Sequence, residues 1–112
     1  MSIKNYIKAA RLRTLPLSIS GIIVGSFLAL SAGFFDWYIF ILSTFTTIGF
    51  QVISNFANDY GDGIKGTDAI RIGEERMVSS GKISPKQMKL AIIYTTILTI
   101  ITAVMLIYKA FG

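Results

Sequence analysis

The chain has 112 residues, of which 53% are hydrophobic and only 15% are charged. Ordinary soluble domains carry about 25% charged residues, so the composition argues against a soluble globule and also against intrinsic disorder. The absence of cysteine excludes disulfides, zinc–thiolate sites and iron–sulfur clusters, and the absence of histidine removes the usual proton shuttle. The net charge of +5 raises nucleic acid as a possible partner, which the placement of the charges decides.

Long uncharged runs dominate the sequence: Leu17–Phe35, Trp37–Asn58 and Leu90–Tyr108. A helix needs about 20 residues to cross the hydrocarbon core of a bilayer, and each run has about that length. Backbone groups in lipid must be satisfied within their own segment, so each run is expected to be helical. The sequence therefore predicts an all-α membrane protein with three transmembrane helices, at about 15–35, 37–58 and 86–109.

Local signals agree with these spans. Pro16 suits the first turn of a helix, and Ser84 followed by Pro85 is typical of a helix start. The G-x-x-x-G pattern from Gly21 to Gly25 allows another helix to approach closely. The first run could instead be a signal peptide, with a cleavage site near residues 31–33. Its length and the two spans that follow favour a membrane helix.

Basic residues are distributed unevenly around the spans. Four precede the first span and six lie between Asp59 and Lys89, whereas only the short turn Phe35–Trp37 joins the first two spans. By the positive-inside rule we expect the N-terminus and the loop at about 59–85 to be cytoplasmic, in a multi-pass protein of the inner or plasma membrane. The positive charge then reflects membrane topology, and no nucleic-acid partner is expected.

Carboxylates and amides gather where the second span meets the loop. Four are spaced by three, four and seven residues, which places them on one helix face: Asn55, Asn58, Asp59 and Asp62. We expect the helix to end directly after this face, at Gly61, Gly63 and Gly66, so that Asp68 can fold back towards it. Several oxygen ligands would then surround one small volume.

Oxygen ligands without histidine or cysteine suit Mg²⁺ or Ca²⁺, and the spacing matches neither an EF-hand nor a P-loop. Mg²⁺ commonly takes one or two carboxylates and completes its shell with water and substrate phosphate. Cationic side chains follow the carboxylates, at Lys65, Arg71 and Arg76. This set suits a diphosphate whose apolar tail lies in the bilayer. The alternative is a polar helix end with ordinary capping, which accounts for one carboxylate better than for three.

The segment resembles the first aspartate-rich motif of the UbiA superfamily of intramembrane aromatic prenyltransferases, whose common form is N-D-x-x-D-x-x-x-D. Asn58, Asp59 and Asp62 are in register, but Gly66 replaces the third aspartate and Asp68 follows two residues later. This longer spacing is characteristic of the naphthoate branch, which makes menaquinone. The flanking stretches at 13–16 and 76–85 also resemble that branch.

The resemblance implies Mg²⁺-dependent transfer of a polyprenyl group from polyprenyl diphosphate to 1,4-dihydroxy-2-naphthoate. It implies a metal site at Asn58, Asp62 and Asp68, and catalytic carboxylates at Asp59, Asp62 and Asp68. The expected substrate-binding residues are Asn55, Asn58, Tyr60, Lys65, Arg71 and Arg76. Tyr60 can equally serve as an interfacial anchor.

The resemblance covers essentially the whole chain but only the N-terminal part of the family's helical bundle. The family's second aspartate-rich motif lies in a later loop, and no Asp or Glu follows Lys89 here. We therefore expect residues 1–112 to be the N-terminal part of a UbiA-type domain, inactive alone and partnered by the remaining helices. Two alternatives stay open: a prenyltransferase for another acceptor such as 4-hydroxybenzoate, and a non-catalytic, truncated small membrane protein.

Overall fold

The computed structural model describes residues 3–65, 77–78 and 80–112, and within these ranges the regular elements are all helical. They are α1 (Ile3–Ala10), a 3₁₀ turn (Leu12–Thr14), α2 (Leu15–Ser31), α3 (Trp37–Lys65) and α4 (Pro85–Phe111). Three stretches are long and apolar enough to cross a bilayer: Ile3–Ser31, Trp37–Ile64 and Pro85–Phe111. The predicted all-α membrane class with three long apolar helices is confirmed.

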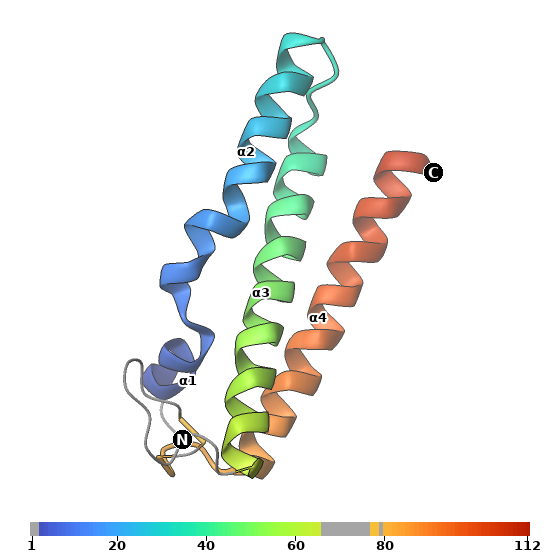
Figure 1. The fold of residues 1–112 in the computed structure, drawn as a ribbon. Helices are drawn as coiled ribbons and strands as arrows, with labels where there is room; N and C mark the ends of the chain where they lie inside the picture. Colours follow the sequence, from blue (N-terminus) through green and yellow to red (C-terminus); the bar gives the residue numbers. More distant parts are fainter. Residues whose placement is uncertain (1–2, 66–76, 79) are drawn as a thin grey trace.

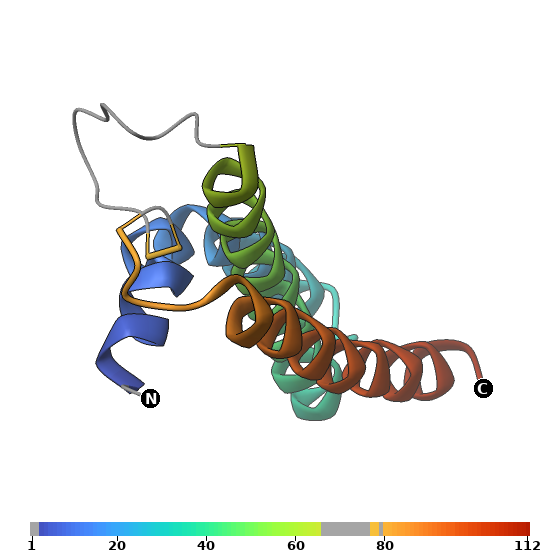
Figure 2. The same cartoon turned by 90° about the horizontal axis from the view of Figure 1, so that it is seen from below.

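The central helix of the bundle is α3, which contacts α1, α2 and α4 (Figure 1). The connection between α2 and α3 lies at one end of the bundle. At the other end, α1 and the start of α4 lie close to the last turns of α3 (Figure 1). Seen from that end, α1 runs across the bundle instead of along it (Figure 2). We call the end formed by α1, the last turns of α3 and the start of α4 the polar end, because the predicted site residues of α3 lie there.

The helix starts follow their local sequence signals. Ser84 caps α4, with its Oγ accepting from the Gln87 backbone N–H at 3.1 Å while Gln87 Oε1 accepts from the Ser84 N–H at 3.3 Å. Pro85 occupies the first turn, where a missing N–H costs nothing. Pro16 has the same place in α2. The start of α3 is held by Asp36, whose Oδ1 accepts from the Tyr38 N–H at 2.8 Å.

Two features of the polar end differ from the sequence expectation. α3 continues through Gly61 and Gly63 to Lys65, so these glycines do not end the helix; Gly66 lies outside the described residues. A glycine costs a helix only about 1 kcal/mol relative to alanine, which tertiary contacts can offset. α1 was not predicted at all. Arg11 joins it to the 3₁₀ turn in a left-handed conformation, with φ of 53°.

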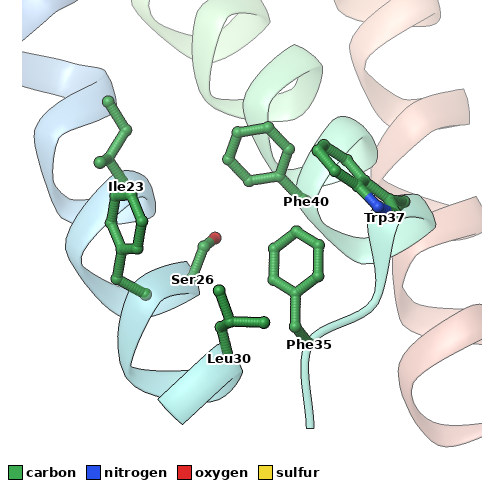
Figure 3. A pocket seen from close by; sticks show the side chains of 7 residues that line it. Ile23, Ser26, Leu30, Phe35, Trp37 and Phe40 are labelled. Carbon is green, nitrogen blue, oxygen red and sulfur yellow. The ribbon is translucent and has the colours of Figure 1, made fainter. Parts of the chain in front are cut away.

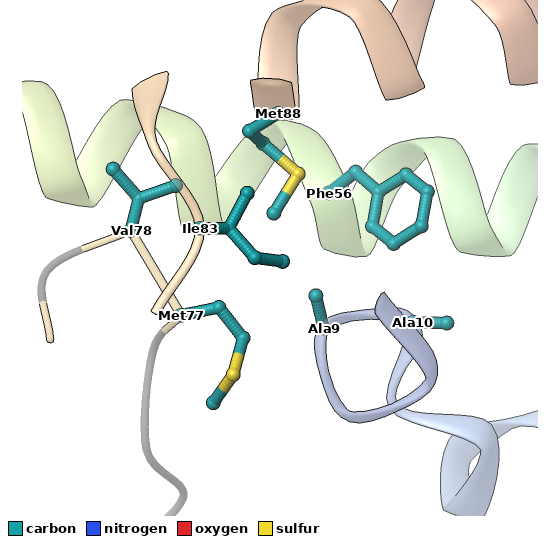
Figure 4. Close-up of a cluster of buried hydrophobic side chains, with 7 residues drawn as sticks. All are labelled: Ala9, Ala10, Phe56, Met77, Val78, Ile83 and Met88. Carbon is teal, nitrogen blue, oxygen red and sulfur yellow. The ribbon is translucent and has the colours of Figure 1, made fainter. Parts of the chain in front are cut away.

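Most of the buried apolar side chains gather at the polar end. They converge from α1, α3, the 77–84 segment and the start of α4 (Figure 4), and they are Ala9, Ala10, Phe56, Met77, Val78, Ile83 and Met88. Tyr6 and Tyr60 pack against this cluster. Further along the bundle burial is sparse: α2 buries no residue, and beyond Met88 the only buried residue of α4 is Thr99. We call the seven buried residues the polar-end core.

The long helices meet through small and hydroxylated residues. A Cβ added to Gly49 of α3 would overlap the side chain of Thr99 on α4, so the two backbones approach closely there. Nearby, Thr46 Oγ1 donates to Thr102 Oγ1 at 3.0 Å. The G-x-x-x-G of α2 makes no such approach among the described residues, because a Cβ on Gly21 or Gly25 meets no heavy atom within 4 Å.

Candidate active site

Asn58 and Asp62 lie one helical turn apart near the end of α3. Residues four positions apart share a helix face, so their side chains project in the same direction. Asn58 is exposed and Asp62 is half-buried. The helix therefore places two oxygen-bearing side chains on one face at the polar end.

Asp59 has a different environment from its neighbour in the motif. It is only 1% exposed, and both carboxylate oxygens accept backbone hydrogen bonds. The Met77 N–H donates to Oδ2 at 2.8 Å and the Val78 N–H donates to Oδ1 at 2.7 Å. Asp59 thus faces the segment that returns from the loop, whereas Asn58 is exposed on another flank of α3.

The segment that Asp59 holds is a compact turn. The Lys82 and Ile83 N–H groups donate to the Met77 carbonyl at 2.9 and 3.1 Å, and the Gly81 N–H donates to the Val78 carbonyl at 3.1 Å. Gly81 supplies the positive φ, 80°, that this turn requires. The turn also contacts α1, because Asn5 Nδ2 donates to the Lys82 carbonyl at 3.2 Å.

Asn55 belongs to a network inside the bundle. It is 4% exposed, and its Nδ2 donates to the Ala10 carbonyl at 2.7 Å and to Thr14 Oγ1 at 3.4 Å. Its Oδ1 accepts from Gln51 Nε2 at 3.4 Å, and Gln51 Oε1 accepts from Ser18 Oγ at 2.7 Å. The sequence interpretation missed Gln51 and Ser18. The signal for Gln51 was available, because a glutamine inside an apolar run four residues before Asn55 shares its helix face.

Tyr60 lies on a different side of α3 from the Asn58 and Asp62 pair. Successive residues of a helix are rotated by about 100°, so Tyr60 and Asp62 point in widely different directions. The Tyr60 ring packs against the polar-end core, which is compatible with an anchoring role. Lys65 is the last residue of α3. The other predicted residues, Asp68, Arg71 and Arg76, lie outside the described residues.

The donor set can be compared with the needs of a metal ion. Within the described ranges, no group of three or more Asp, Glu, His or Cys residues can surround a metal. A cage made entirely of protein ligands, as Ca²⁺ often has, is therefore not formed by these residues alone. Mg²⁺ bound mainly by substrate phosphates needs only one or two protein ligands, and the Asn58 and Asp62 oxygens fit that requirement.

An apolar hollow of about 420 Å³ lies between α2 and the start of α3, at the end of the bundle opposite Asn58 (Figure 3). Its walls are Ile23, Ser26, Phe27, Leu30, Phe35, Trp37 and Phe40. The lining contains one hydroxyl and no charged group, so it offers nothing to bind a diphosphate. The polar end of α3 remains the candidate site.

Comparison with known proteins identifies the family of the chain. Residues 18–111, most of the chain, match the UbiA prenyltransferase family. The chain belongs to this family. The UbiA family match begins within α2 and ends at the last residue of α4, so it includes the Asn58 and Asp62 pair. No solved structure gives a significant match.

Three curated relatives that carry the same name are similar to this chain. The chain is 40% identical over 106 residues to the 1,4-dihydroxy-2-naphthoate octaprenyltransferase of Escherichia coli (strain K12), covering 94% of this chain and 34% of that protein. The protein of the same name from Haemophilus influenzae is 39% identical over 112 residues, covering 97% and 36%. The one from Mycobacterium tuberculosis is 33% identical over 87 residues, covering 78% and 30%. The chain thus spans about a third of the length of these relatives.

Proposed function

We propose that this chain contributes the first half of the active site of a Mg²⁺-dependent prenyltransferase acting in menaquinone biosynthesis. The proposed reaction transfers a polyprenyl group from its diphosphate to 1,4-dihydroxy-2-naphthoate. The observation that carries the proposal is the pairing of Asn58 and Asp62 on one face of α3, at the polar end of a helix long enough to span a bilayer. Relatives named for this reaction support the choice of acceptor.

The proposed roles follow from charge and position. Asn58 and Asp62, with Asp68, would hold a Mg²⁺ ion at the diphosphate. A bound metal would supply positive charge to offset the negative charge of the departing diphosphate. Lys65, Arg71 and Arg76 are proposed to contact the same phosphates. Asn55 acts indirectly, by fixing this part of α3 against the Ala10 carbonyl.

The membrane placement is part of the proposal. The polyprenyl tail is proposed to lie beside the long helices while the diphosphate stays at the polar end. We propose that this end faces the cytoplasm, because the basic residues before the first span and after the second favour that side. The aromatic residues at the opposite end, Phe34, Phe35, Trp37 and Tyr38, then lie at the outer interface.

A complete site needs more protein than this chain supplies. The second carboxylate cluster of the family and most of the walls around the acceptor are proposed to belong to the remaining helices. Since the chain spans about a third of its relatives, activity is proposed only for a protein in which these helices are present.

A chimera tests the proposal directly. Residues 1–112 replace the aligned third of the Escherichia coli relative, and membranes are assayed with octaprenyl diphosphate and either naphthoate or 4-hydroxybenzoate as acceptor. The proposal expects Mg²⁺-dependent prenylation of the naphthoate. A chimera that is present in the membrane but makes no product, or that prefers 4-hydroxybenzoate, would contradict it. The isolated 112-residue chain is the control and is expected to be inactive.

A further inference from the structure

Asp59 is the most completely enclosed charged group among the described residues, and its surroundings differ from those of a metal ligand. At 1% exposure, an ionised carboxylate is costly unless it is fully hydrogen-bonded. Here the Met77 and Val78 amides satisfy one oxygen each, at 2.8 and 2.7 Å. Charge-assisted bonds of this length are among the strong hydrogen bonds of proteins. The carboxylate is thus committed to the backbone of the returning segment.

The same contact holds together elements that are distant in the sequence. Met77 and Val78 belong to the polar-end core with Ala9 of α1, Phe56 of α3 and Met88 of α4 (Figure 4). The carboxylate of α3 therefore fastens the returning segment, and the segment in turn packs on α1 and α4. Without the Asp59 carboxylate, the N–H groups of Met77 and Val78 would be buried without a hydrogen-bond partner.

The position of this contact on α3 gives it a consequence for the site. Asp59 lies between Asn58 and Asp62, in the part of the helix that also contains Gly61 and Gly63. Glycine weakens a helix, so this part depends on tertiary contacts for its regular geometry. On the far side of the loop, Met77 is bonded to α3 through Asp59.

We propose that Asp59 is a positioning residue of the prenyl diphosphate site, which holds the last turns of α3 and the returning segment in one fixed arrangement without binding the metal. This inference rests on the proposed function for the identity of the substrate. It gives the residues of the N-D-x-x-D motif different roles, because Asn58 and Asp62 face the ligand whereas Asp59 faces the protein.

The first test measures the positioning itself in the 112-residue chain, reconstituted in lipid vesicles. Trypsin cleavage after Lys82 requires the turn to open, because Ile83 is buried and its N–H is bonded to the Met77 carbonyl. Asp59→Ala should accelerate this cleavage about tenfold or more, since two amides lose their buried acceptor. Asp36→Asn, at the opposite end of the bundle, is the control and should leave it unchanged. Equal rates for Asp59→Ala and the unmodified chain would overturn the proposal.

A second variant disrupts the same contact by changing the donor instead of the carboxylate. Val78→Pro removes the N–H that donates to Asp59 Oδ1 and leaves the carboxylate in place. It should also accelerate cleavage after Lys82, and combining it with Asp59→Ala should add little. Fully additive effects would show that the two residues act separately, which contradicts the proposal.

The third test separates positioning from metal binding in the chimera. Asp59→Asn should lower turnover about tenfold while leaving the Mg²⁺ concentration for half-maximal activity unchanged, because the amide still accepts one of the two backbone bonds. Asp62→Asn should raise that Mg²⁺ concentration. A raised requirement in Asp59→Asn, with normal protection at Lys82, would reassign Asp59 as a ligand. If the chimera is inactive, the proposed function fails, whereas the cleavage results still decide the positioning role.

Discussion

The polar end of the molecule and its long helices are held together by different forces. At the polar end, seven apolar side chains from four segments are buried against one another. Along the helices, most large apolar side chains are exposed, such as Leu17 at 84% and Phe27 at 68%. The contacts there involve Gly49 against Thr99 and Thr46 against Thr102.

This difference follows from the solvent that each region faces. The polar end is proposed to lie at the membrane surface, where water drives apolar side chains together and favours a compact apolar core. Lipid tails are as apolar as leucine and provide no such drive, so helices within lipid associate through close backbone approach and hydrogen bonds. The polar end should therefore respond to lost apolar volume, and the spans to added volume.

The largest expected effect comes from making one substitution at both ends of α3. In the chimera, Asp62→Asn should reduce turnover by about 10²–10³, the scale of one lost electrostatic contact to a transition state. Asp36→Asn, at the opposite end, should be nearly neutral because an asparagine also caps a helix. The measurement is prenyl transfer at saturating Mg²⁺. Near-normal turnover in Asp62→Asn would contradict the metal-binding role of Asp62 and leave the polar end with a structural role only.

Removing apolar volume should matter more at the polar end than in the spans. Met88 is fully buried in the polar-end core, and Met88→Ala should lower the free energy of unfolding by about 2–5 kcal/mol. Leu98→Ala, on the half-exposed side of the same helix, should cost clearly less because that side chain is 50% exposed. Unfolding by SDS in mixed micelles compares the two. Equal losses would mean that both regions share one kind of core.

Adding apolar volume should destabilise the protein where the long helices are in close contact. Gly49→Ala places a methyl group into the Thr99 side chain, and overpacking of this kind costs about 1–3 kcal/mol. Gly21→Ala adds the same group to α2 where no heavy atom lies within 4 Å, so it should be neutral or slightly stabilising. The same SDS titration measures both. In a larger protein, destabilisation by Gly21→Ala would reveal another helix against that face.

The parts of the fold that depend on local residues could be predicted from the sequence. The spans follow from uncharged runs of membrane length, and the start of α4 follows from Ser84 and Pro85. The end of α3 could not be predicted in the same way. Gly61 and Gly63 argue locally for a break, whereas the nearby contact between Asp59 and Met77 joins residues 18 positions apart. Helix propensity depends on neighbouring residues, so it cannot predict a contact between residues so far apart in the sequence.

The residues of the candidate site also differ in whether the local sequence alone predicts their placement. The pairing of Asn58 with Asp62 follows from helical spacing alone, and the structure places the two residues on one face. The spacing also groups Asp59 with them, but its direction depends on where Met77 and Val78 return to the helix. Asn55 is similar, since its partner is the Ala10 carbonyl of a helix that the sequence did not predict.

The close contact between Gly49 and Thr99 has a consequence for how the protein meets membranes of different thickness. Sliding α4 along α3 by one turn, about 5.4 Å, would carry Thr99 away from Gly49 and press it against a bulkier neighbour on α3. The two helices therefore keep a fixed register. A thicker or thinner bilayer would be met by tilting the pair as one unit or by adjustment of the lipid, and Ser84 would keep its position relative to Asp59 within the protein.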